Sequence, residues 1–190
     1  VPFFGKDSLG MFMNKPRLGG LNFHTSGYVN IEDNNDLDFG TGAFTMECWA
    51  TAKYESQGSS INVILSLGGD GAGSSSAALV SHSTNKLGGY VGGSTLDADS
   101  AFTIGDWYHI AIARDGNGLC TLYIDSEAQS DTETNQGNIT NSDVKFIGRS
   151  GLNANRDYNG IIDDVKLYNK ALTPAEIKKN YNATKGKHKN

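Results

Sequence analysis

The residues with the clearest chemical potential lie near the C-terminus, where an acid interrupts an apolar strand pattern. Successive side chains of a strand point to opposite faces. If residues 160–168 form a strand, one face carries Ile161, Asp163, Val165 and Leu167. Burying a carboxylate is costly unless it is hydrogen-bonded or bound to a cation. Asp163 is therefore predicted to be a metal ligand, with a carboxylate that accepts N–H bonds from a neighbouring loop as the alternative. Asp164 is expected to point the other way, into solvent.

Oxygen-rich loops supply further candidate ligands for a cation. Acids and amides gather at residues 32–36, 97–99 and 153–157. Calcium takes roughly six to eight oxygen ligands of these kinds. None of the three segments matches an EF-hand loop, and Asx turns in contact with solvent explain the same residues. Calcium is the cofactor that the sequence favours, with solvated turns as the alternative.

Sugar recognition calls for an exposed aromatic ring beside amides and carboxylates. A ring contributes about 0.5–1.5 kcal/mol beyond the area it buries. The aromatic residues in or next to loops are Tyr54, Tyr90 and Tyr158, and one of the polar loops adds Asn155 and Asp157. These five residues are the predicted ligand-binding set.

The elements that must position these residues are almost all strands. Residues 44–50 alternate cleanly, and residues 107–114 and 119–125 flank an Asp-Gly-Asn-Gly turn that is typical of a tight hairpin. A capping box at residues 173–176 predicts one short helix that ends near Tyr181. About nine or ten strands at regular spacing indicate an antiparallel β-sandwich.

Composition limits the classes of partner. The chain has 190 residues and a net charge of −5, which argues against nucleic acid, and it has no apolar run long enough to span a membrane. We expect an N-terminal extension at 1–20, one domain at 21–181 and a basic tail at 182–190. Cys48 and Cys120 are compatible with either a disulfide or two buried thiols. The chain begins at Val1 rather than Met, so we expect a processed protein or an excised piece.

Three segments in order resemble a known family. Residues 37–49, the Trp-x-His and Tyr-x-Asp strands of the 107–125 hairpin, and the closing run 160–177 resemble laminin-G-like domains. The chain is thus identified as a member of the concanavalin A-like lectin/glucanase superfamily. The resemblance implies an all-β, two-sheet antiparallel jelly-roll sandwich with one short C-terminal helix. Residues 171–188 also resemble laminin-G-like modules of bacteriophage virion proteins.

The resemblance raises the question of glucanase activity. The retaining glucanases of this superfamily carry their acids as Glu-x-Asp-x-x-Glu, and none of the six glutamates of this chain begins such a motif. The histidines have no zinc-ligand spacing, and no Gly-x-Ser-x-Gly elbow occurs. The sequence therefore favours binding without catalysis.

The function expected from the sequence is surface recognition. The leading interpretation is a virion-surface or decoration module that contacts glycans, proteins or other virion proteins, with oligomerisation open. A secreted calcium-dependent carbohydrate-binding module is the alternative, and a glucanase is the third. The expected location is the virion surface or the extracellular space.

Overall fold

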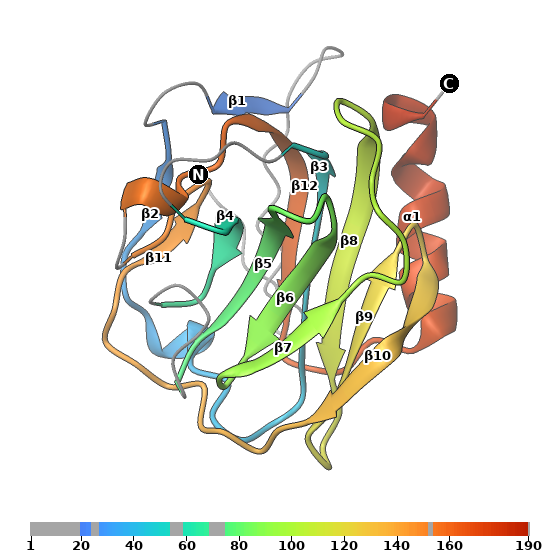
Figure 1. Ribbon diagram of the computed structural model, residues 1–190. Coiled ribbons are helices and arrows are strands. Elements are labelled where there is room, and N and C mark those ends of the chain that lie inside the picture. The colour runs from blue at the N-terminus through green and yellow to red at the C-terminus, as the bar shows by residue number, and fades with distance from the viewer. Residues whose placement is uncertain (1–19, 24–26, 54–58, 69–74, 152–153, 190) are drawn as a thin grey trace.

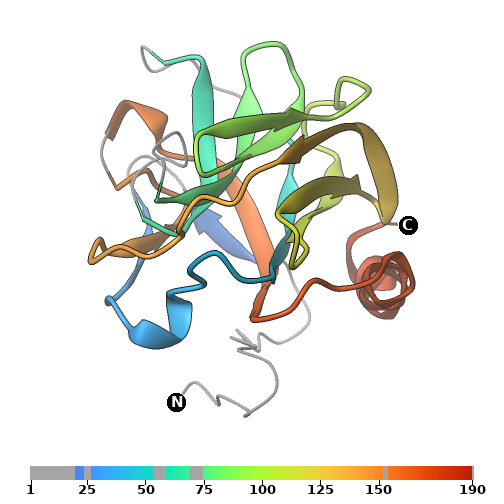
Figure 2. The same cartoon turned by 90° about the horizontal axis from the view of Figure 1, so that it is seen from below.

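Two antiparallel sheets of six strands pack face to face (Figures 1 and 2). This computed structural model describes residues 20–23, 27–53, 59–68, 75–151 and 154–189, so Tyr54 and the expected extension up to residue 19 lie outside the described residues. The sandwich confirms the predicted fold class. The described residues form twelve strands, more than expected, because several strands have only three residues.

The first sheet contains the first and last strands of the domain and the predicted hairpin of residues 107–125. Its strands, in spatial order, are β1 (Leu21–Phe23), β12 (Gly160–Tyr168), β3 (Phe44–Thr51), β8 (Trp107–Arg114), β9 (Leu119–Ile124) and β10 (Glu127–Thr134). The β8–β9 hairpin is present as predicted, in the register Ile110 to Ile124 through Arg114 to Cys120.

The second sheet lies in front of β3 and β12 in Figure 1. Its strands, in spatial order, are β2 (Val29–Ile31), β11 (Lys145–Ile147), β4 (Ile61–Ser66), β5 (Ala77–His82), β6 (Leu87–Val91) and β7 (Ser94–Asp97). Two short 3-10 turns, η1 (Asn35–Leu37) and η2 (Ala154–Arg156), lie in the connections. η2 packs against β4.

The core lies between the two sheets. β3 contributes the residues that alternation predicted, Phe44, Met46, Cys48 and Ala50, all with no exposed surface. Cys48 and Cys120 are both buried and unpaired, which corresponds to the thiol alternative. Burial raises the pKa of the Cys120 thiol to about 11, so neither redox nor metal chemistry is favoured there.

A bulge in β12 overturns the predicted orientation of Asp163. Its pairing with β3 shifts register between Asp163 and Lys166, and Asp164 adopts a φ of 48°. An extra residue on one strand reverses the side-chain alternation beyond it. The inward residues are therefore Ile162, Val165 and Leu167. Asp163 lies on the outer face opposite Trp49, so the predicted inward acid is wrong.

The C-terminal helix α1 (Pro174–His188) covers the outer face of the first sheet beside β8 and β10 (Figures 1 and 2). The predicted capping box is present: the Glu176 N–H donates to Thr173 Oγ1 at 3.3 Å, and the Thr173 N–H donates to Glu176 Oε2 at 2.8 Å. The helix continues to His188 rather than ending near Tyr181. Within the described residues, no helix has the length and apolar character needed to cross a membrane.

Candidate functional site

The two outer faces of the sandwich carry the polar and aromatic side chains that could act chemically. We call the outer face of the first sheet beneath α1 the closed face, and the outer face of the second sheet the open face. Register assigns the side chains to each face, because residues paired across antiparallel strands point to the same side.

A buried acid lies at the centre of the closed face. Glu47 has no exposed surface, and Oε1 accepts hydrogen bonds from Lys166 Nζ at 3.0 Å, from Asn180 at 2.9 Å and from the Tyr168 hydroxyl at 3.3 Å. His109 Nε2 lies 3.5 Å from Oε2. Burial alone would raise the pKa of Glu47, but His109 and Lys166 outweigh it and hold the pKa below 4.5. This carboxylate stays ionised and joins α1 to the sheet.

Aromatic rings surround the last turn of α1. Trp49 is fully buried beneath the helix rather than between the sheets, and its Nε1 donates to Thr184 Oγ1 at 2.8 Å. The His188 ring stacks on Trp49 at a centroid distance of 4.5 Å and lies 4.6 Å from the half-buried Trp107. The imidazole thus contacts two indoles.

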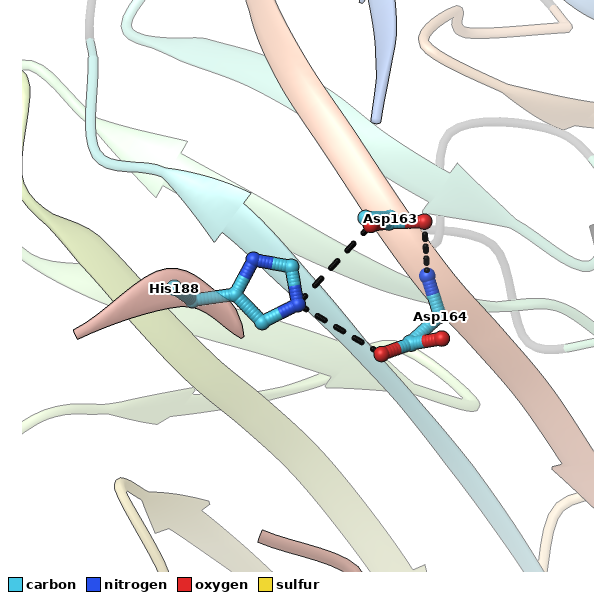
Figure 3. Close-up of side chains that lie close together, drawn as sticks. All are labelled: Asp163, Asp164 and His188. Carbon is cyan, nitrogen blue, oxygen red and sulfur yellow. Dashed lines mark hydrogen bonds and ion pairs between the residues drawn. The ribbon is translucent and has the colours of Figure 1, made fainter. Parts of the chain in front are cut away.

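His188 faces the two adjacent acids of the β12 bulge (Figure 3). Its Nε2 lies 3.4 Å from Asp164 Oδ2 and 3.8 Å from Asp163 Oδ2. The Asp164 N–H donates to Asp163 Oδ1 at 2.9 Å. The hydrogen bond with His188 is the main cause of the lowered pKa of Asp164. Asp164 is therefore half-buried and paired, not solvated as expected.

Among the described residues, the side chains of Asp163, Asp164 and His188 lie close enough together to bind one metal ion. Calcium prefers oxygen ligands alone, whereas an imidazole beside carboxylates suits zinc and related transition metals. Calcium binding at Asp163 stays a prediction.

The open face begins with an aromatic and cationic corner, which consists of Tyr28, Phe146, Arg149 and Asp157. Tyr28 contacts Phe146 edge to face at 5.7 Å, and the Arg149 guanidinium lies 4.3 Å above the Tyr28 ring. Arg149 Nε is 3.5 Å from Asp157 Oδ1. Tyr28 is 44% exposed, so part of its ring is accessible.

A row of paired residues continues from this corner across the sheet. It runs through Phe146, Ser66, Ala78, Tyr90 and Thr95. Tyr90 is half-exposed and Thr95 is exposed. The row therefore places a second aromatic ring on the same face as Tyr28, but Ser66 and Ala78 between the two rings have no exposed surface.

A histidine and an acid meet across β6 on the same face. His82 Nε2 lies 3.3 Å from Asp97 Oδ1, although the two residues belong to β5 and β7. Gly88 lies between them, and a Cβ there would approach His82 Nε2 to 2.9 Å and Asp97 Oδ1 to 3.1 Å. Burial lowers the pKa of His82, and Asp97 opposes that shift. The missing side chain at position 88 is what allows this pair.

The predicted ligand-binding residues do not lie together in the structure. Tyr90 lies on the open face, Asp157 belongs to its corner, and Asn155 is exposed in η2 beside β4. Tyr158 is only 2% exposed and its hydroxyl donates to the Thr51 carbonyl, so this ring offers no surface to a ligand.

Sequence reasoning missed the corner residues Tyr28, Phe146 and Arg149. Alternation around β2 and β11 was visible, but the pairing that joins these distant strands was not. For the His82–Asp97 pair, glycines within a strand are a usable signal of close approach.

Solved structures share the fold. The carbohydrate-binding module CBM40 of the Ruminococcus gnavus IT-sialidase, bound to alpha2,3 sialyllactose, aligns with a TM-score of 0.67 and 17% identity, over 86% of this chain and 96% of that chain. The binding domain of Paraclostridial Mosquitocidal Protein 1 aligns with a TM-score of 0.63 and 20% identity, over 86% of this chain and 42% of that chain.

An enzyme also shares the fold over part of its length. Trypanosoma rangeli sialidase aligns with a TM-score of 0.66 and 17% identity over 90% of this chain, and the match spans 28% of the sialidase chain. None of the curated proteins compared with the chain matches it. A profile of the concanavalin A-like lectin/glucanases superfamily matches residues 23–178, most of the chain. The protein belongs to this superfamily.

Proposed function

We propose that the protein is a glycan-binding module whose open face recognises the sugar. The observation that carries the proposal is the corner of Tyr28, Phe146 and Arg149, where an exposed ring and a guanidinium lie together beside β2 and β11. The structural likeness to carbohydrate-binding modules supports the same class of ligand.

The chemistry of the corner suits a sugar. Aromatic rings present an apolar surface for the C–H groups of a pyranose, and the guanidinium donates hydrogen bonds to hydroxyl or carboxylate oxygens. Asp157 holds Arg149 in place, which reduces the entropy that binding would cost. Tyr90 lies on the same face but is separated from the corner by the buried Ser66 and Ala78, so it offers a second, separate ring to an oligosaccharide.

The proposal is binding without hydrolysis. A glycosidase generally needs two carboxylates that face one glycosidic bond. Glu47 is held by Lys166, Asn180 and His109 beneath α1, where a sugar has no access. Release of reducing sugar from glucans or sialylated oligosaccharides would contradict this part.

We further propose that the protein is displayed on the surface of a virion or of a cell. The similarity of residues 171–188 to modules of phage virion proteins supports the virion. Co-purification with phage particles is the result expected. A chain recovered only apart from particles favours the secreted lectin instead, and calcium dependence of glycan binding would add weight to that alternative.

A glycan array with matched variants tests the proposal. Tyr28→Ser removes the exposed ring of the corner, and Leu119→Ser removes a similarly exposed apolar side chain from the first sheet, with 44% and 42% exposure respectively. We expect Tyr28→Ser to lose array signal and Leu119→Ser to keep it. Equal signals from the two variants would contradict the assignment to the open face.

A further inference from the structure

The bulge in β12 sends two consecutive acids toward one imidazole. Neighbouring side chains of a regular strand point to opposite faces. Here the register shift and the φ of 48° at Asp164 bring Asp163 and Asp164 together beside the last turn of α1 (Figure 3). Aspartate tolerates the left-handed region better than most residues.

The three side chains are held in place before any ligand binds. The Asp164 N–H occupies Asp163 Oδ1, which leaves Oδ2 of Asp163 facing the histidine. The His188 ring is stacked on Trp49, and its side chain is only 2% exposed. Fixed donors of this kind favour chelation because little side-chain entropy remains to be lost.

The spacing of the donor atoms fits a metal ion. Ligand atoms about 2.0–2.2 Å from Zn²⁺ in a tetrahedron stand roughly 3.3–3.6 Å apart. Nε2 of His188 lies 3.4 Å and 3.8 Å from the two carboxylate oxygens. A direct charge-assisted hydrogen bond is shorter, about 2.7–2.9 Å. Both contacts are longer than this ideal hydrogen bond, and the 3.4 Å contact lies within the range that zinc ligands adopt.

Charge also allows a divalent cation. Two carboxylates face the imidazole, and the competing cation Lys187, 3.5 Å from Asp164 Oδ2, is 61% exposed and free to move into solvent. Lys166 is engaged by Glu47 at 3.0 Å. Water can complete the coordination.

We propose that Asp163, Asp164 and His188 form a binding site for a divalent transition-metal ion of the zinc type, which fastens the C-terminal end of α1 to β12. The imidazole selects against calcium and magnesium, which take oxygen ligands. The site lies on the closed face, apart from the proposed glycan surface, so its presence does not depend on glycan binding.

The test is a Co²⁺ titration of the full chain without an affinity tag, followed by absorption of the visible d–d bands, with thermal unfolding in Zn²⁺ as a second readout. We expect one saturable site and a rise in Tm of roughly 5 °C at saturating Zn²⁺. Asp163→Asn, which preserves shape, and His188→Gln should each weaken Co²⁺ binding tenfold or more.

His82→Gln is the matched control, because within the described part of the chain His82 is paired with a single carboxylate, that of Asp97. This variant should bind Co²⁺ as the unmodified chain does. Absence of d–d bands, equal affinity in Asp163→Asn, loss of binding in His82→Gln, or an equal rise in Tm with Ca²⁺ would each overturn the proposal.

Discussion

The closed and open faces are made by the same kind of strand but differ in how their polar groups are satisfied. On the closed face Glu47, fully buried, is neutralised by Lys166 and by donors from α1. On the open face Arg149 and Tyr28 remain partly exposed although they contact each other. A charge buried beneath a helix serves the fold, whereas a charge beside an exposed ring remains available to a ligand. This difference is the basis for the proposal that one face serves stability and the other recognition.

The largest loss in the free energy of unfolding is expected from Glu47→Gln on the closed face. The substitution leaves Lys166, which is 9% exposed, without its buried counter-charge. Removing one partner of a buried pair typically costs about 3–5 kcal/mol. We expect a loss near the lower end in the free energy of unfolding measured by urea denaturation, because the glutamine amide keeps some hydrogen bonds.

Asp97→Asn is the open-face counterpart, since the Asp97 side chain is 45% exposed. Its expected cost is below about 1 kcal/mol. Similar losses in the two variants would remove the energetic distinction between the faces.

Gly88→Ala tests the close approach of His82 and Asp97. The new Cβ would lie 2.6 Å from the Leu96 carbonyl oxygen, which is backbone and cannot turn away. Overpacking of this kind costs roughly 1–3 kcal/mol. Gly116→Ala, in the β8–β9 turn with nothing within 4 Å of its Cβ, is the control and should change unfolding little. If Gly88→Ala left the free energy of unfolding unchanged, β6 would have to shift enough to accommodate the new Cβ.

Arg149→Lys separates charge from shape on the open face. Lysine keeps the positive charge near Asp157 but loses the planar group above Tyr28 and the forked donors. We expect glycan affinity by calorimetry to fall roughly tenfold while unfolding in urea changes by less than about 1 kcal/mol. Unchanged affinity would show that the guanidinium does not contact the sugar.

Acid should weaken the closed face first. The folded pKa of Glu47 lies below its ordinary 4.5, because His109 and Lys166 outweigh the effect of burial. Folding therefore favours the ionised form, and this stabilisation is present above pH 4.5 and is lost as pH falls through the lowered folded pKa. In urea titrations between pH 7 and pH 3, Glu47→Gln should lose less stability than the unmodified chain. Parallel curves would contradict this.

Local pattern predicted most of the fold but only part of the site. The inward residues of β3 and the capping box at Thr173 followed from alternation and local chemistry. The bulge at Asp164 did not, because a single extra residue leaves no trace in the apolar pattern. The end of α1 was missed for a related reason. Ile177 is its one buried apolar residue, and the last turns are held by tertiary contacts of Thr184 and His188 with the sheet.

The candidate ligand residues depended still more on tertiary pairing. Tyr90 was predicted because it lies near an expected loop, and the structure places it within β6 on the open face. Tyr28 and Phe146 meet only because β2 pairs with β11, a contact between distant segments. Tyr158 looked exposed from its loop-like neighbours but fills the core beside Thr51.

Amide hydrogen exchange, with and without the glycan that the array identifies, tests the division between the faces most directly. Binding at the open face should slow exchange in β2, β11 and β4–β7 and leave α1 and β12 unchanged. Slowed exchange in α1 and β12, with none in β2 and β11, would contradict the account.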